Sequence, residues 1–136
     1  MESKGEAWLK KYYPVEAETL ANASDIECVQ HSLNKWRGLT KDVLEKYGLV
    51  SDESLIEGDN FGFYIDDDSC ALCVKYLVQE VMCTGCPLSK QLGKPCDANY
   101  IAPYSIFIRT GNPLLMIKAL EKTLLSLQNR KNDGNE

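Results

Sequence analysis

The first half of the chain carries a stripe of apolar residues that recurs every three or four positions. Its members are Ile26, Val29, Leu33 and Trp36. This spacing is typical of the buried face of an amphipathic helix. Ser24 stands three residues before Glu27 in the capping-box arrangement, and Gly38 is a residue at which the helix can end. We therefore expect a helix between residues 24 and 38 whose apolar stripe lies in the core.

Two shorter helices are expected on either side of this one. Thr40 can cap a second helix that Gly48 closes. A still shorter helix before Pro14 would carry Trp8 and Tyr12. The N-terminal half is therefore expected to be helical.

The C-terminal part contains the clearest helical pattern. Asn112 serves as its cap, and Pro113 takes the first helical position, where the missing N–H costs nothing. The apolar face comprises Leu114, Ile117, Leu120, Leu124 and Leu127. We expect a long helix over residues 112–130 and a frayed tail over residues 131–136.

Two runs of aromatic and β-branched residues, Phe61–Ile65 and Tyr104–Ile108, predict strands. The expected fold class is therefore α+β and mainly helical, with a small two-stranded element. The length of 136 residues indicates a single domain over residues 1–136. Within it we expect a helical part over residues 1–50, a metal-stabilised, cysteine-rich part over 61–111, and the C-terminal helix.

Charge is unevenly distributed along the chain, whose formal net charge is -5. Residues 1–68 carry 15 acidic and 7 basic side chains, whereas residues 69–136 carry 5 acidic and 8 basic ones. The acidic side chains gather in residues 52–68, a segment without Lys or Arg that would repel a phosphate backbone. We interpret it as a solvated loop. The alternatives are a surface for a basic partner and a divalent-ion site at residues 66–68.

The sequence has no apolar stretch of the length that a signal peptide or a membrane span requires. We therefore expect a cytoplasmic protein and no membrane association. In a reducing cytosol, closely spaced cysteines are better explained by metal binding or redox chemistry than by structural disulfides.

Five of the six cysteines follow a regular spacing, Cys70-x2-Cys73-x9-Cys83-x2-Cys86-x9-Cys96. Each C-x2-C pair places two thiolates on a turn, from which both sulfurs reach one tetrahedral zinc ion with bonds of about 2.3 Å. These five residues therefore predict a metal site. We expect zinc ahead of an iron–sulfur cluster, because the spacing does not match the ferredoxin runs.

The first pair also belongs to an apolar stripe that continues through Val81, on a helix capped by Asp68 or Ser69. A helix over residues 74–82 spans about 14 Å, whereas sulfurs on one zinc ion lie about 3.8 Å apart. A site made of both pairs therefore requires this segment to bend back. Two alternatives remain open, in which Cys96 joins either the first pair or the second pair.

Cys28 and His31 are additional candidate ligands, three residues apart on the helix expected at residues 24–38. Each is more typical of a buried core side chain than of a metal ligand. An aspartate of residues 66–68 is a further candidate. By contrast, Gly85 and Pro87 keep Cys83 and Cys86 out of regular structure, where unliganded thiols would be a liability.

The cysteine region resembles small uncharacterised proteins of bacteriophages and bacteria that share a C-x-L-C…C-x-G-C-P-[VL]…G-x-x-C…P-Y pattern. The matching segments are Cys70-Ala-Leu-Cys73, Cys83-Thr-Gly-Cys86-Pro87-Leu88, Gly93-Lys-Pro-Cys96 and Pro103-Tyr104, with Lys35–Leu39 upstream. The resemblance covers residues 33–125 in outline and is strong over 70–104. It implies a phage-type protein of the host cytoplasm with a shared cysteine site, and it supplies no activity.

Three functional classes follow from these features. The favoured class is a non-enzymatic protein-interaction module in which zinc holds the loop-rich half. The phage-type setting would make the partner a host protein, such as a defence component. A second class is a thiol redox protein that uses Cys83 and Cys86, although the βαβ context typical of such motifs is missing.

The third class binds nucleic acid or an anionic nucleotide through the basic second half. Its candidate residues are Lys75, Lys90, Lys94, Arg109 and Lys118, with Tyr76, Tyr100, Tyr104 and Phe107 for stacking. No Gly-rich phosphate loop, H-E-x-x-H or G-x-S-x-G motif occurs, and no catalytic residue is identified. The sequence therefore favours a role other than enzymatic catalysis.

Overall fold

The computed structural model describes residues 3–58, 60–65, 69–76, 86–93 and 102–132, with side chains up to residue 130. It is an α+β fold and mainly helical, as expected. The helical elements are α1 (Lys4–Tyr12), the 3-10 helix η1 (Ala17–Leu20), α2 (Asp25–Arg37), α3 (Lys41–Lys46), α4 (Ala71–Tyr76), α5 (Pro87–Leu92), α6 (Pro103–Thr110) and α7 (Leu114–Asn132). The strands are β1 (Val50–Asp52), β2 (Leu55–Gly58) and β3 (Phe61–Tyr64).

The predicted caps start the helices of the N-terminal half and the C-terminal helix. The Glu27 N–H donates to Ser24 Oγ over 3.1 Å at the start of α2, and Gly38 follows the last residue of that helix. The Val43 N–H donates to Thr40 Oγ1 at the start of α3. The Leu114 N–H donates to Asn112 Oδ1 over 3.0 Å before α7. These side chains satisfy N–H groups that have no partner inside their helices.

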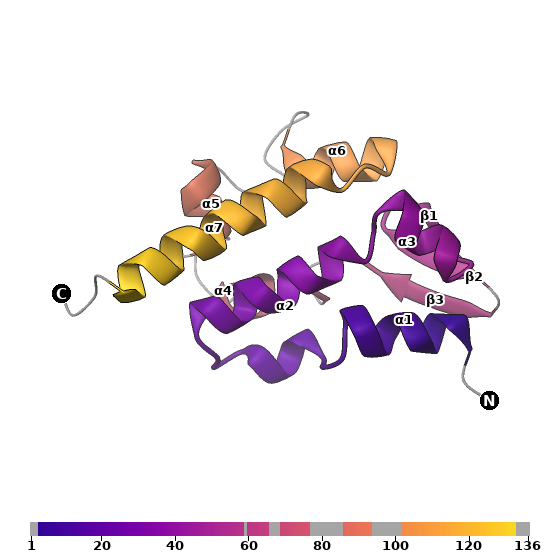
Figure 1. Cartoon of the computed structure of the whole chain (residues 1–136), viewed down its shortest axis with the longest axis horizontal. Coiled ribbons are helices and arrows are strands. Elements are labelled where there is room, and N and C mark those ends of the chain that lie inside the picture. The colour runs from indigo at the N-terminus through magenta and orange to yellow at the C-terminus, as the bar shows by residue number, and fades with distance from the viewer. Residues whose placement is uncertain (1–2, 59, 66–68, 77–85, 94–101, 133–136) are drawn as a thin grey trace.

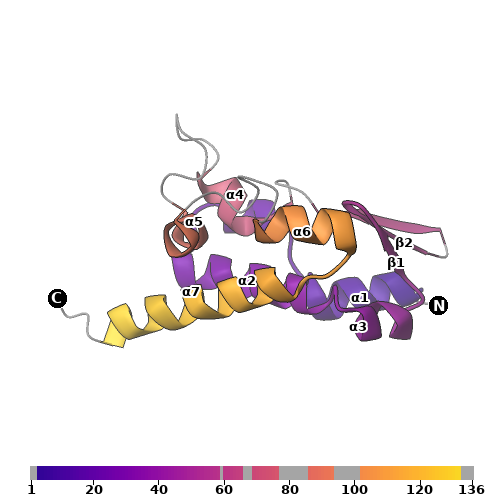
Figure 2. The ribbon, with the colours of Figure 1, turned by 90° about the horizontal axis from the view of Figure 1, so that it is seen from above.

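Helix α2 lies at the centre of the molecule. The C-terminal helix α7 runs back along one side of it and α1 lies along the other side (Figure 1). Turned by 90°, the molecule shows α4, α5 and α6 on one side of the layer formed by these long helices (Figure 2). The predicted apolar stripe of α2 is thereby covered from several directions.

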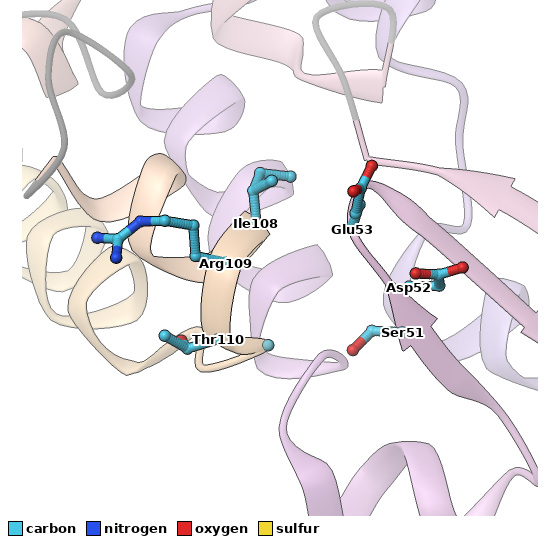
Figure 3. Close-up of a pocket in the computed structure, with 7 residues that line it drawn as sticks. Ser51, Asp52, Glu53, Ile108, Arg109 and Thr110 are labelled. Atoms are coloured by element: carbon cyan, nitrogen blue, oxygen red, sulfur yellow. The ribbon is translucent and has the colours of Figure 1, made fainter.

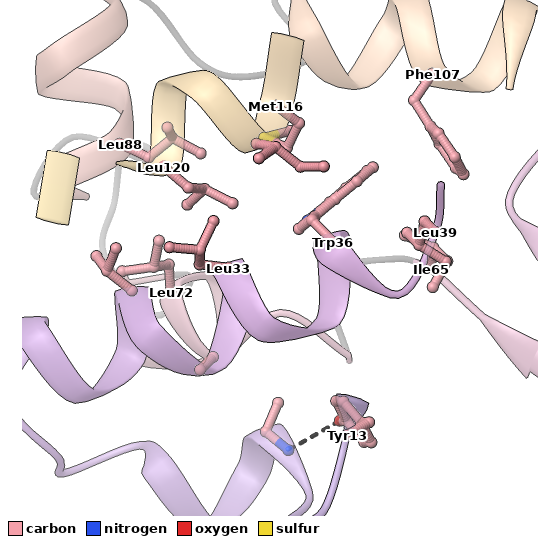
Figure 4. Close-up of a cluster of buried hydrophobic side chains, with 14 of the residues drawn as sticks. Tyr13, Leu33, Trp36, Leu39, Ile65, Leu72, Leu88, Phe107, Met116 and Leu120 are labelled. Atoms are coloured by element: carbon pink, nitrogen blue, oxygen red, sulfur yellow. Dashed lines mark hydrogen bonds between the residues drawn. The ribbon is translucent and has the colours of Figure 1, made fainter. Parts of the chain in front are cut away.

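The core forms where α2 meets α6 and α7 (Figure 4). The Trp36 ring meets Phe107 of α6 edge to face, with ring centroids 4.8 Å apart. Leu33 lies beneath Leu120 of α7 in the same cluster. On the opposite side of α2, the Trp8 indole N–H donates to the Gly38 carbonyl oxygen over 2.9 Å, which ties α1 to the end of α2.

The sheet is antiparallel, in the order β1-β2-β3, and has one strand more than the two-stranded element that the sequence predicts. Strands β1 and β2 arise from the end of the helical part and from the acidic segment, for which the sequence predicts a solvated loop. Each of these strands has only three or four residues, so the alternation of apolar and polar side chains is too short to be recognised in the sequence. The predicted strand at Phe61–Ile65 is confirmed as β3.

The second predicted strand, at Tyr104–Ile108, is wrong because these residues form α6. Pro103 occupies the first turn of that helix, and Gly111 ends it in the left-handed conformation with φ of 76°. A short, mostly apolar run fits a buried helix face as well as a strand, and here burial of Phe107 against Trp36 selects the helix. Among the described helices, none has the length and apolar character that crossing a bilayer would require.

Candidate metal centre

The structure places four of the candidate cysteines on three helices. Cys28 lies on α2, Cys70 immediately precedes α4, Cys73 lies one turn into α4, and Cys86 immediately precedes α5. All four are free thiols. Cys83, Cys96 and the aspartates at residues 66–68 lie outside the described residues.

Cys70 caps the N-terminus of α4. Its carbonyl oxygen accepts the Val74 N–H over 2.9 Å, and its Sγ accepts the Cys73 N–H over 3.4 Å. Ser69, one of the two residues expected to cap this helix, therefore does not do so, and the other, Asp68, lies outside the described residues. The unpaired N–H groups of a first helical turn favour negative charge, which places the Cys70 sulfur where a thiolate is stabilised.

Neighbouring groups strengthen this effect at Cys70. The pKa of its thiol is lowered to about 5, mainly because the Cys73 thiol hydrogen-bonds to it, with further contributions from the charge of Lys35 and from Ser32. Ser32 Oγ lies 3.9 Å from the Cys70 sulfur. Burial raises the pKa of the Cys70 thiol, but these hydrogen bonds and charges outweigh its effect.

Lys35 belongs to this centre although sequence reasoning did not select it as a functional residue. Only 1% of its surface is exposed, and its Nζ donates to the Ser69 carbonyl oxygen over 2.9 Å. A buried ammonium group requires such partners. The spacing of Cys28, His31 and Lys35 at i, i+3 and i+7 indicates a shared helix face and is the signal that could have identified it.

Cys86 occupies the equivalent position at α5, since it immediately precedes the first helical residue, Pro87. It is 6% exposed, and burial raises the pKa of its thiol, while the backbone N–H groups of Ser89 and Leu88 oppose that increase. The charge of Cys70 raises the pKa of Cys86 further.

Cys28 and His31 make the contacts of core residues. Cys28 Sγ donates to the Leu20 carbonyl oxygen over 3.5 Å, and burial raises the pKa of this thiol. His31 Nε2 lies 2.7 Å from the Val15 carbonyl oxygen, and its ring stacks edge-on against Tyr13. Its Nδ1 is buried and has no partner among the described residues.

Cys70 and Cys73 are thus the candidate ligands that the structure brings into hydrogen-bonding contact. In the described part of the chain, no three Cys, His, Asp or Glu side chains are arranged to hold a metal ion. The adjacent sulfurs fit two positions of a tetrahedral thiolate site. The remaining ligands of such a site would have to come from Cys86 after a local shift, or from the two cysteines outside the described residues.

Several residues considered for nucleic-acid binding have partners within the fold. Lys75 forms an ion pair of 2.8 Å with Asp25, whose carboxylate also accepts the hydroxyl of Tyr76. The Tyr104 hydroxyl donates to the Ile65 carbonyl oxygen over 2.6 Å. Phe107 is fully buried and cannot stack on a base. Lys90 and Lys118 are exposed, whereas Lys94 and Tyr100 are outside the described residues.

A cleft of about 420 Å³ lies between the end of β1 and the end of α6 and involves none of the cysteines. Asp52 and Glu53 line one wall, and Ile108, Arg109 and Thr110 line the other (Figure 3). The Arg109 guanidinium extends away from both carboxylates (Figure 3). The sequence did not predict this cleft, because its two walls are more than fifty residues apart along the chain.

Searches against protein-family models, curated proteins and solved structures found no significant match. The resemblance to phage and bacterial proteins in the cysteine pattern therefore stays a prediction. Two segments of that pattern, at Cys70–Cys73 and Cys86–Leu88, begin α4 and α5.

Proposed function

We propose that this protein is a small protein-interaction module stabilised by zinc. The observation that carries the proposal is the placement of Cys70 and Cys73 together at the N-terminus of α4, with Cys86 immediately before α5. A thiolate must form before zinc binds, and the N–H groups at Cys70 favour that form.

The buried charge of Lys35 supports the same proposal. A zinc ion with several thiolate ligands carries a net negative charge, which is costly to bury unless a cation lies nearby. Lys35 supplies that cation and holds the residue before Cys70 through the Ser69 carbonyl oxygen. Cys83, Cys86 and Cys96 are the candidates for the remaining ligand positions.

The outer face of the sheet is the proposed partner-binding surface. The strand register places Val50, Asp52, Leu55, Glu57 and Tyr64 on this face. Val50 is 61% exposed and Tyr64 is 60% exposed, which is unusual for large apolar side chains. The apolar side chains of Val50 and Tyr64, together with the carboxylates of Asp52 and Glu57, fit a partner surface that combines apolar and basic groups. The resemblance in the cysteine pattern makes a host protein the candidate partner.

Native mass spectrometry with elemental analysis of the untagged protein tests the metal. We expect one zinc ion per chain and, after cobalt substitution, thiolate charge-transfer bands. Cys70→Ser and Cys73→Ser should lose the metal, whereas Cys28→Ser should retain it because Cys28 bonds to the Leu20 carbonyl oxygen instead. A folded, metal-free monomer whose thiols titrate freely would rule out the zinc part of the proposal.

A pull-down from host lysate, with and without nuclease, tests the partner surface. The double variant Val50→Ser/Tyr64→Ser should lose a captured protein that the wild type retains after nuclease treatment. Val15→Ser is the matched control, because Val15 is an exposed valine outside the sheet. Capture of nucleic acid alone, abolished by charge reversal at Lys90 and Lys94, would replace the protein-interaction proposal with nucleic-acid binding.

A further inference from the structure

Helix α7 carries three of the six large apolar side chains that are exposed in the described part of the chain. Leu114 is 50% exposed, Leu115 is 46% exposed and Leu125 is 58% exposed. The opposite side of the helix packs into the core through Met116 and Leu120. The helix lies at the edge of the molecule, below α5 and α6 in Figure 2. The three leucines therefore lie on a side of α7 that no other described element covers.

Four exposed side chains form one stripe along this side of α7, namely Leu114, Lys118, Glu121 and Leu125. The steps between them are four, three and four residues, which is the spacing of the contact seam between two packed helices. The stripe is about 17 Å long. Read from its C-terminal end, it has the same spacing and again a leucine at each end, and the lysine and the glutamate exchange places. The stripe is therefore complementary to its own reverse.

We propose that this face of α7 binds the same face of a second copy of the chain, with the two helices antiparallel and related by a two-fold axis. Leu114 of each copy then lies against Leu125 of the other copy, and Lys118 lies opposite Glu121. A two-fold dimer requires a self-complementary surface, and the stripe has this property. The association goes beyond the interaction function proposed above, because it uses a different surface from the outer face of the sheet.

The charged side chains at the centre of the stripe are available for this contact. Arg37 of α2 binds Glu121 through Oε2 over 3.0 Å, and both side chains are half-exposed. The other carboxylate oxygen, Oε1, can accept a proton from the ammonium group of a second copy. Lys118 makes no hydrogen bond or ion pair with the described residues. Two Lys118–Glu121 pairs fix the antiparallel direction, since parallel helices would place lysine against lysine.

The third exposed leucine, Leu115, lies beside the stripe on the same edge as Lys122, seven residues later. Equivalent edges face each other in an antiparallel pair of helices, so the aliphatic stem of Lys122 covers Leu115 of the second copy. The contact extends over only about three helical turns and is smaller than the standard interface of about 1,600 Å². The dimer is therefore weak, with a dissociation constant in the micromolar range.

Sedimentation velocity of the full-length protein between about 1 and 200 µM tests this proposal, and the wild type should shift from monomer to dimer. Lys118→Glu and Glu121→Lys should each raise the dissociation constant at least about tenfold, because like charges then face each other. An equimolar mixture of these two variants should form dimers again, since each acidic side chain of one variant faces a basic one of the other. Leu125→Ser should also weaken the dimer.

Lys41→Glu is the matched control, because it makes the same charge change at an exposed position on α3 and should leave the dimer intact. Val50→Ser/Tyr64→Ser should also remain dimeric, so that loss of the dimer is distinguished from loss of a captured host protein. The proposal is overturned by a monomer at every concentration, by a dimer that Lys118→Glu does not weaken, or by a mixture of the charge variants that stays monomeric. Should Leu125→Ser fail to fold by circular dichroism, the charge variants still decide.

Discussion

The ammonium group of Lys35 donates a hydrogen bond to the carbonyl oxygen of Ser69, 34 residues further along the chain and inside the protein. This contact joins the last turns of α2 to the residue that precedes Cys70. The position of the Cys70 sulfur relative to α2 therefore depends on a lysine that is almost fully buried.

Lys35→Met should lower the free energy of unfolding by about 1–3 kcal/mol, because the Ser69 carbonyl oxygen would lose its donor in a buried position. Urea unfolding followed by circular dichroism measures this change. Lys41→Met is the control, because Lys41 is exposed on α3. Equal effects of the two substitutions would contradict the structural role assigned to Lys35.

Asp25→Asn should destabilise the protein by roughly 1 kcal/mol at pH 7, since Asp25 Oδ1 accepts hydrogen bonds from Lys75 and Tyr76 of α4. Burial alone would raise the pKa of Asp25, but these hydrogen bonds and the charge of Lys75 lower it below the usual 3.8. A carboxylate with a lowered pKa stabilises the fold above that usual value, and the contribution is lost as the pH falls through the folded-state pKa.

Thermal unfolding of wild type and Asp25→Asn should therefore differ at pH 7 and converge below pH 3.8. Asp42→Asn is a matched control, because Asp42 also lies in a first helical turn but is exposed on α3. A difference that persists unchanged at low pH would show that charge at Asp25 is not the cause.

Gly58→Ala should destabilise the sheet, whereas Gly62→Ala should not. A Cβ at Gly58 would overlap the backbone carbonyl oxygen of Gly48, and backbone cannot move aside cheaply, so we expect a loss of about 1–3 kcal/mol. A Cβ at Gly62 would lie 3.7 Å from Leu55 Cδ1, an ordinary contact. Chemical denaturation of the two variants compares them, and similar stabilities would refute the close approach of β2 to Gly48.

His31 should titrate below its usual pKa of 6.5, because burial disfavours the imidazolium and the charge of Lys35 adds to this effect. Between the folded-state pKa and 6.5, the unfolded chain binds a proton that the folded protein does not. This residue therefore makes the fold less stable as the pH drops below 6.5. The chain has one histidine, so an NMR titration follows it directly, with the urea-unfolded chain as the control. A folded-state midpoint at or above 6.5 would mean that His31 Nδ1 has a charged or hydrogen-bonding partner.

The helices that the sequence predicted correctly were those with capping residues close to their ends in the chain. Ser24, Thr40 and Asn112 cap their helices through side-chain atoms that the sequence identifies. The strands β1 and β2 and the helix α6 were missed or misassigned. Their segments are short, and pairing or burial against distant residues such as Trp36 decided their conformation.

The candidate metal centre was predictable in part. The cysteine spacing identified Cys70 and Cys73, because thiol pairs are recognisable from the sequence alone. The spacing of Lys35 from Cys28 and His31 indicates a shared helix face, but the contact of Lys35 with Ser69 and the capping role of Cys70 depend on how α2 packs against α4. The sheet face with Val50 and Tyr64 likewise could not be predicted from the sequence, since it exists only after the three strands pair.

The pairing of α2 with α7 has a consequence for synthesis on the ribosome. The apolar side of α2, with Leu33 and Trp36, is covered by Met116 and Leu120 of a helix that is translated some eighty residues later. A nascent chain that ends before α7 exposes this surface to solvent and to chaperones. The protein can therefore complete its core only after translation has passed α7, and premature stop codons before that helix should yield chains that are degraded.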